Sequence, residues 1–131
     1  MILVRDKRKS PDNFMSKLDL KLKIRNIPDW PQNGVIFRDI TPLLQDKKYF
    51  RQAIHDLCRL FPAKKIDKIV GIDARGFLLA AAMAYKLGTG IAIIRKKGKL
   101  PHKRLSQDYT LEYGKASIEI HNDAIKKGER V

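Results

Sequence analysis

The spacing of apolar residues changes along the chain and predicts its elements. Residues 17–24 (KLDLKLKI) alternate strictly between polar and apolar, which is typical of a strand, yet Leu20, Ile24 and Ile27 also share one helical face. Helix and strand both stay open for this segment. Residues 28–34 (PDWPQNG) predict a rigid turn, because two prolines lack amide donors and Asn-Gly permits positive φ. Residues 35–40 then predict a short strand.

Helical signals follow this strand. Thr41 before Pro42 predicts an N-cap with proline at the first helical position. A longer helix is expected from Asp46 to about Phe61, because its apolar residues recur on one face and would cover a core. That apolar stripe consists of Phe50, Ile54, Leu57, Cys58 and Phe61.

Strand, helix and strand alternate in the middle of the chain. Residues 66–72 are a mostly apolar strand, 73–76 a sharp turn, 77–87 an alanine-rich helix, and 91–94 another strand after a glycine stop at 88–90. This spacing is typical of a βαβ unit, so it predicts an α/β fold with a parallel sheet. Further strands are expected near 109–113 and 116–120.

Composition narrows the class of protein. With 131 residues, 44% hydrophobic and 32% charged, the chain suits one folded domain rather than a disordered protein. No run of about 18 apolar residues indicates a membrane span. The single cysteine, Cys58, excludes an intramolecular disulfide and favours a reducing, cytoplasmic location. Residues 1–15 predict a flexible basic leader, with Met15 as an alternative start, and residues 16–131 predict the folded domain.

The formal net charge of +14 indicates a polyanionic partner: nucleic acid, membrane phosphate or a phosphorylated small molecule. Most of the excess lies in residues 1–25 and 95–104. The second run contains no aromatic residue that would stack on a base, which makes nucleic acid an unlikely partner. The first run is typical of a tail and the second of a loop between structured segments.

Two turns carry candidate anion-binding chemistry. Residues 70–76 (VGIDARG) lie where a parallel strand gives way to a helix, and the helix start and the Arg75 guanidinium both favour phosphate. Arg95 and Lys99 follow the next strand and would reach the same edge. On the residues alone, a solvated arginine and a solvated charge run remain alternatives. The histidines and Cys58 show no metal-ligand spacing, so no metal-binding residue is assigned.

Four segments together resemble the adenine phosphoribosyltransferase family: 24–40 (IRNIPDWPQNGVIFRDI), 70–77 (VGIDARGF), 94–101 (IRKKGKLP) and 111–120 (LEYGKASIEI). The resemblance covers residues 20–131, with the motifs in family order. It implies a phosphoribosyltransferase-type parallel-sheet core with a base-binding hood formed by residues before about Asp46. It also implies purine salvage by a homodimer, in which 5-phosphoribosyl 1-pyrophosphate and adenine give AMP and pyrophosphate with substrate-borne Mg²⁺.

For the base, the resemblance implies that Ile36 and Arg38 read the adenine edge through backbone groups while Phe37 packs on its face. From the residues alone, an ordinary core position is the favoured interpretation of Phe37. Glu112 and Tyr113 resemble a pair on a mobile loop that closes over the site, with the Glu112 carboxylate interacting with the base. A strand-end carboxylate that is merely solvated is the alternative.

For the phosphates, the resemblance implies a pyrophosphate loop that includes Arg75, which with Glu112 is assigned a catalytic role. Asp73 and Ala74 precede it, at a turn where this family often has a cis peptide bond. Arg95 and Lys99 match basic residues that reach the pyrophosphate, typically across a dimer interface.

The family pattern continues beyond the position of Val131 into a strand with paired acidic residues and an Ala-Thr-Gly-Gly-Thr loop for the ribose and 5-phosphate. The resemblance therefore implies an incomplete core sheet, and we expect this chain to bind pyrophosphate or adenine weakly without making AMP. Two rival hypotheses are a non-catalytic purine- or pyrophosphate-binding module and a basic nucleic-acid-binding protein.

Overall fold

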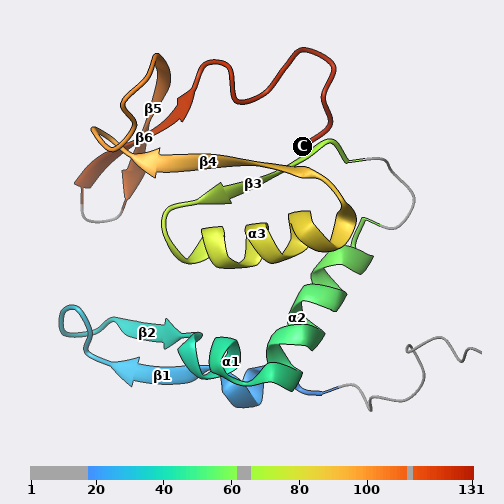
Figure 1. Cartoon of the computed structure of the whole chain (residues 1–131). Helices are drawn as coiled ribbons and strands as arrows, with labels where there is room; N and C mark the ends of the chain where they lie inside the picture. Colours follow the sequence, from blue (N-terminus) through green and yellow to red (C-terminus); the bar gives the residue numbers. More distant parts are fainter. Residues whose placement is uncertain (1–17, 62–65, 112–113) are drawn as a thin grey trace, which may run out of the picture. The chain divides into compact units, whose positions relative to one another are not determined.

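The computed structural model describes residues 18–61, 66–111 and 114–131, so the predicted leader 1–15 and the predicted site residues Glu112 and Tyr113 lie outside the described residues. The chain divides into two compact units, residues 1–53 and 54–131 (Figure 1).

The described part of the first unit begins with a short helix and a β-hairpin. The segment left open between helix and strand is a 3-10 helix, η1 (Leu20–Lys23), because the Asp19 side chain accepts a hydrogen bond from the Lys21 amide at 3.0 Å. Strand β1 (Arg25–Pro28) follows and pairs antiparallel with β2 (Ile36–Asp39). Sequence reasoning did not predict β1, whose four residues show no clear alternation.

The predicted rigid turn joins these two strands. The Asp29 carboxylate accepts a hydrogen bond from the Gly34 amide at 2.8 Å, and Trp30 N–H donates to the Val35 carbonyl at 3.2 Å. Gly34 has φ +84°, a left-handed conformation that glycine adopts without steric cost. These bonds close the turn and set Ile27 opposite Phe37 in the hairpin.

Two helices follow, and the predicted cap of the first is wrong. Helix α1 (Thr41–Gln45) has Ile40 at its N-cap, and Thr41 is already helical. The Asp39 carboxylate is instead the acceptor, at 2.9 Å from the Thr41 amide and 2.8 Å from its hydroxyl. A carboxylate accepts both bonds, whereas the hydroxyl is used as a donor.

Helix α2 (Lys47–Arg59) begins after Asp46, whose carboxylate accepts from the Lys48 amide at 3.0 Å. The hydrogen bond from Lys23 is the main reason that the pKa of Asp46 lies below its usual value. Ile54 and Cys58 of the predicted apolar stripe are buried. Phe61 is not, at 48% exposed, because the helix ends at Arg59 and Phe61 lies beyond the predicted helical face.

The second unit contains the predicted βαβ arrangement. Strands β3 (Lys68–Ile72) and β4 (Gly90–Lys96) pair in parallel, with Gly71 opposite Ile93, and α3 (Arg75–Leu87) connects them. Gly88 ends the helix in the left-handed conformation, at φ +67°. The prediction of a parallel pair is confirmed here.

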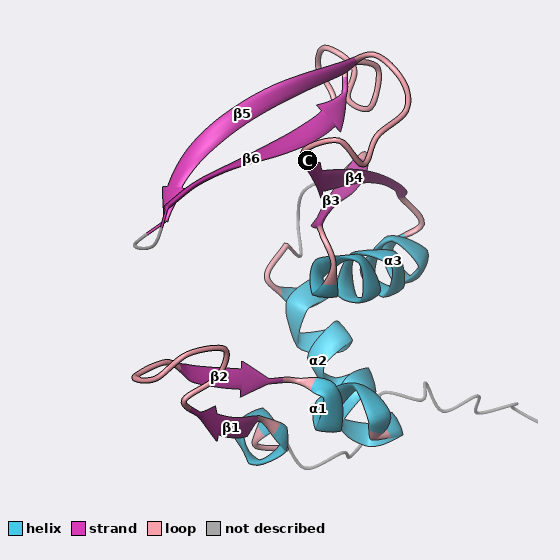
Figure 2. Cartoon of the chain, turned by 90° about the vertical axis from the view of Figure 1, so that its left-hand side faces the viewer, coloured by secondary structure: helices cyan, strands magenta, loops and turns pink. Residues whose placement is uncertain are grey.

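The rest of the sheet is antiparallel. Strands β5 (Arg104–Leu111) and β6 (Gly114–His121) pair along their whole length, and the sheet order is β3-β4-β6-β5. Strand β6 meets β4 at two residue pairs, Arg95 with Glu119 and Lys96 with Ile118. Figure 2 shows β5 and β6 as a curved ribbon that extends well past β4.

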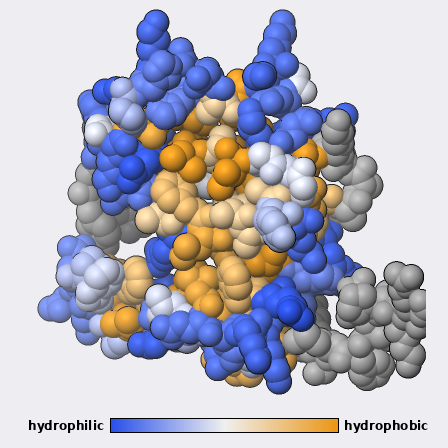
Figure 3. Space-filling model, in the orientation of Figure 1, coloured by the Kyte–Doolittle hydropathy of each residue, from blue (hydrophilic) through white to orange (hydrophobic). Residues whose placement is uncertain are grey.

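Surface character differs between the helix and the ribbon of this unit. Figure 3 shows apolar side chains over α3 and hydrophilic ones over β5 and β6. On α3, Leu78 is 54% and Tyr85 91% exposed, while Ala80, Met83 and Ala84 are buried. None of the helices in the described part of the chain has the length and apolar character needed to cross a bilayer.

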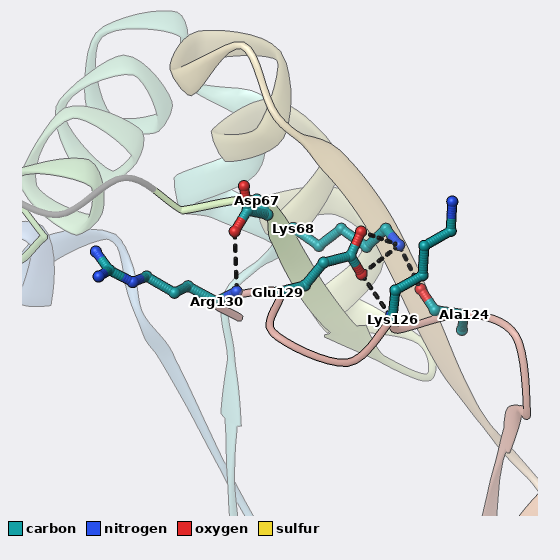
Figure 4. Close-up of polar contacts among 6 residues, drawn as sticks. All are labelled: Asp67, Lys68, Ala124, Lys126, Glu129 and Arg130. Carbon is teal, nitrogen blue, oxygen red and sulfur yellow. Dashed lines mark hydrogen bonds and ion pairs between the residues drawn. The ribbon is translucent and has the colours of Figure 1, made fainter.

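The residues after β6 are held against the start of β3 (Figure 4). Lys68 Nζ lies 2.8 Å from Glu129 Oε2 and donates to the Ala124 carbonyl at 2.7 Å. Asp67 and Arg130 exchange two hydrogen bonds: the Arg130 amide donates to the Asp67 carboxylate at 3.0 Å, and the Asp67 amide donates to the Arg130 carbonyl at 2.9 Å. The segment 124–130 is therefore fixed by contacts with residues about sixty positions earlier.

We expect Gly71→Ala to destabilise the second unit. A methyl group at residue 71 would lie 2.9 Å from Ala80 Cβ, and Ala80 is only 4% exposed, so helix and strand must move apart. The free energy of unfolding, measured by urea titration, should fall by about 1–3 kcal/mol. The control Gly76→Ala meets its nearest atom at 3.8 Å and should leave stability unchanged or raise it slightly. Equal losses in both variants would contradict this packing.

We expect Glu129→Gln to lower thermal stability in a pH-dependent way. The Lys126 amide and the Lys68 ammonium hold the pKa of Glu129 below its ordinary 4.5. A carboxylate with a lowered folded pKa stabilises the protein above its unfolded pKa, and this contribution disappears as the pH falls through the folded pKa. The melting temperature should therefore differ from wild type at pH 7 and converge with it near pH 3. Asp123→Asn removes an equal charge from the same segment and should show no such pattern.

Candidate anion and base site

Parallel pairing of β3 and β4 brings the two candidate anion-binding turns to one edge of the sheet. Ile72 lies opposite Ile94, and the Asp73 amide continues the pairing with a hydrogen bond to the Ile94 carbonyl at 2.9 Å. The next residue in β4 is Arg95. Because both strands run in the same direction, the turns that follow them start side by side.

The Asp73 carboxylate is the point where these two turns meet. Its Oδ2 atom lies 3.3 Å from Arg95 Nε and 3.7 Å from Lys99 Nζ, and the Asp73 side chain is only 8% exposed. Arg95 also donates through Nη1 to the Lys99 carbonyl at 3.2 Å, so one guanidinium joins both turns. The structure thus brings three predicted site residues together.

Burial and charge act in opposite directions on Asp73. Burial tends to raise the pKa of this carboxyl, but the Lys99 charge and the Arg95 hydrogen bond and charge outweigh it, so the pKa lies below its usual value. Asp73 is therefore ionised at neutral pH. It partly neutralises Arg95 and Lys99 and holds both side chains at the sheet edge.

The turn between β3 and α3 supplies the remaining predicted residues of the phosphate side. The Asp73–Ala74 peptide bond is cis, as predicted. Arg75 is the first residue of α3 and is exposed. The 13-residue helix directs the positive end of its dipole toward this turn, so the helix start and Arg75 both favour an anion.

The predicted base-binding residues lie on β2, in the first unit. Ile36 is 55% exposed, and Phe37 is half-buried against Trp30, with ring centroids 4.5 Å apart in an edge-to-face arrangement. Arg38 donates a hydrogen bond to the Asn26 side chain opposite it in β1. Phe37 is thus anchored by a second aromatic ring within its own hairpin.

Sequence reasoning missed a buried charge beside the anion site. Glu119 in β6 is 3% exposed and lies directly opposite Arg95 in the β4–β6 pair. Its Oε2 atom accepts from the Gly98 amide at 2.9 Å and lies 3.1 Å from Arg104 Nε. The available signal was an acidic residue between Ile118 and Ile120, in a segment that the sequence predicts to be a strand.

Described His, Cys, Asp and Glu side chains form no group of three or more that could hold a metal ion. Together, the parallel pair and the basic turns at its edge define an α/β protein with a candidate anion site at the carboxyl ends of its parallel strands.

Comparison with known proteins assigns the family. No family model matches the chain. The chain is 54% identical over 117 residues to the adenine phosphoribosyltransferase of Thermotoga maritima. The matched region covers 89% of this chain and 68% of that protein. An adenine phosphoribosyltransferase structure from Thermoanaerobacter pseudethanolicus matches with TM-score 0.82 and 49% identity, over 86% of this chain and 65% of that one.

The Saccharomyces cerevisiae adenine phosphoribosyltransferase, solved in complex with an imino-altritol bisphosphate and adenine, matches with TM-score 0.77 and 38% identity over 84% of this chain and 65% of that one. The chain belongs to the adenine phosphoribosyltransferase family. It spans about two thirds of the length of the relatives it matches.

Proposed function

We propose that this chain carries the adenine and pyrophosphate recognition elements of an enzyme that transfers the phosphoribosyl group of 5-phosphoribosyl 1-pyrophosphate to adenine, giving AMP and pyrophosphate. The observation that carries the proposal is the meeting of two basic turns at Asp73, with Arg95 and Lys99 on one turn and Arg75 following the other. The yeast relative, solved with adenine and an imino-altritol bisphosphate, supports adenine and a phosphorylated compound as ligands.

In the proposed reaction, electrostatic stabilisation of the leaving pyrophosphate is the main contribution of the protein. A ring nitrogen of adenine forms a bond to the anomeric carbon while the bond from that carbon to the pyrophosphate oxygen breaks. The leaving pyrophosphate keeps the electron pair, and the ring N–H proton of adenine is released to water. Positive charge held in advance where this negative charge develops lowers the barrier. Arg75, Arg95 and Lys99 supply that charge. Mg²⁺ enters as part of the substrate, bound to its phosphate oxygens, as Mg²⁺ commonly does.

Base recognition is assigned to the hairpin. Phe37 packs on the adenine face, and backbone groups of Ile36 and Arg38 read its edge. Glu112 and Tyr113 complete the proposed site on the connection between β5 and β6, with the Glu112 carboxylate on the base. We further propose that the protein acts in the cytoplasm and that it is a homodimer. Sedimentation equilibrium, which measures the molar mass in solution, tests the homodimer.

The whole reaction is tested by measuring AMP formation from adenine and 5-phosphoribosyl 1-pyrophosphate with Mg²⁺. The assay compares the 131-residue chain with a chain extended past Val131 by the corresponding sequence of the Thermotoga maritima relative. The proposal requires AMP formation by the extended chain and its loss in the extended Arg75→Gln variant. An inactive extended chain that is folded and binds neither ligand would refute it.

We expect Arg95→Gln and Lys99→Gln to weaken pyrophosphate binding. Each removes a charge-assisted contact to an anion, worth about 1.5–3 kcal/mol, or about tenfold or more in Kd. Isothermal titration calorimetry with pyrophosphate measures the change. Lys103→Gln removes an equal charge from the exposed residues before β5 and should alter Kd little. Equal losses in all three variants would show a diffuse charge effect instead of a site.

We expect Phe37→Ala to weaken adenine binding by about 1–3 kcal/mol, the usual value of one aromatic ring stacked on a base. Phe37→Tyr keeps the ring and should bind adenine nearly as wild type. Titration calorimetry gives the affinities, and thermal unfolding gives the stability of each variant. A lowered melting temperature with unchanged adenine affinity in Phe37→Ala would show that Phe37 serves only the packing against Trp30.

A further inference from the structure

The turn between β4 and β5 has to be rigid for Lys99 to serve the anion site. Lys97, Gly98 and Lys99 are all exposed, and Gly98 has φ +82°. Two backbone hydrogen bonds hold the turn locally: Lys97 N–H to the Ser117 carbonyl at 3.1 Å, and Lys99 N–H to the Lys96 carbonyl at 3.3 Å. Side chains from β5 and β6 provide the rest of its support.

Glu119 supplies the central contact. Its carboxylate reaches from β6 to the Gly98 amide at 2.9 Å, at the residue where the turn reverses. The same oxygen lies 3.1 Å from Arg104 Nε, and Arg104 donates through Nη1 to the Leu100 carbonyl at 3.3 Å. Glu119 and Arg104 therefore hold the turn on both sides of Lys99.

The position of Glu119 links the turn to the anion site. Glu119 lies opposite Arg95 across the β4–β6 pair, and Arg95 holds both Asp73 and the Lys99 carbonyl. A buried carboxylate is costly unless charged or hydrogen-bonding groups surround it. Here burial tends to raise the pKa of Glu119, but the Gly98 amide and Arg104 outweigh burial and keep the pKa below its usual value. Glu119 is thus ionised, and its carboxylate accepts a hydrogen bond from the turn itself.

We propose that Glu119 is a positioning residue that fixes the Gly98 turn so that Lys99 faces the same anion as Arg95. This inference rests on the proposed function, because it assigns pyrophosphate to the site at Asp73. Glu119 does not touch the ligand. It acts through the Gly98 amide and Arg104 on the side chain that does.

The test compares Glu119→Leu with Glu119→Gln, which keeps an oxygen acceptor for the Gly98 amide. Titration calorimetry measures Kd for pyrophosphate and, separately, for adenine. We expect Glu119→Leu to weaken pyrophosphate binding about tenfold, the loss expected when a charge-assisted contact no longer orients its partner. Glu119→Gln should recover most of that loss, and adenine affinity should not change. The control Asp108→Asn removes a carboxylate charge from the same ribbon and should leave both affinities unchanged.

A double-mutant cycle with Lys99→Gln separates positioning from a merely structural role. If Glu119 acts through Lys99, then Lys99→Gln has little further effect on pyrophosphate binding in the Glu119→Leu background. Amide hydrogen exchange at Gly98 should be faster in Glu119→Leu than in wild type. If Glu119→Leu fails to fold, Arg104→Gln replaces it, since the Arg104 side chain is 43% exposed, and pyrophosphate affinity should again fall while adenine affinity holds.

The outcomes separate the two claims. A folded wild-type chain that does not bind pyrophosphate overturns the proposed function and the role of Glu119 with it. Wild-type binding that persists unchanged in Glu119→Leu or Arg104→Gln, or effects that simply add to that of Lys99→Gln, overturns the positioning role alone.

Discussion

The parallel pairing of β3 with β4 is the constraint on which the rest of the second unit depends. It requires a crossover connection, and α3 provides one that packs so closely on β3 that residue 71 has no room for a side chain. The same pairing makes the two strands end together. As a result, Asp73 and Arg95, which are more than twenty positions apart in the sequence, lie close enough to form an ion pair.

At this edge of the sheet, acidic side chains lie among the basic ones and form ion pairs with them. The chain has an excess of fourteen positive charges, yet the carboxylates of Asp73 and Glu119 lie among the cations and are buried. Asp73 lowers the electrostatic cost of placing Arg95 and Lys99 close together, and Glu119 does the same for Arg104. The net effect is a cationic edge whose side chains are ordered before a ligand arrives, and such preorganisation avoids paying ordering entropy on binding.

How much the sequence predicts depends on the distance between interacting residues. The βαβ unit, the turn at 28–34 and the α2 helix follow from local periodicity and turn chemistry, and they are confirmed. The pattern of Thr41 before Pro42 predicts a threonine cap for α1, and this prediction is wrong. The Asp39 carboxylate, two residues earlier, is the acceptor and takes hydrogen bonds from both the amide and the hydroxyl of Thr41. Glu119 was missed because its partners, Gly98 and Arg104, are identified only when β6 pairs with both β4 and β5. Periodicity contains no information on such pairings.

The hairpin of the first unit and the sheet edge of the second unit differ in the same respect. The proposed base-binding residues lie on a hairpin in which Trp30 and Phe37 are seven positions apart, so its geometry is nearly local. The proposed anion-binding residues lie in a unit that is built from a parallel pair, an antiparallel strand and contacts such as Lys68 with Glu129, sixty-one positions apart. Long-range contacts are formed only when the whole unit folds cooperatively. Conditions that loosen the second unit should therefore abolish anion binding as a single event, while the hairpin retains the contacts that orient Phe37.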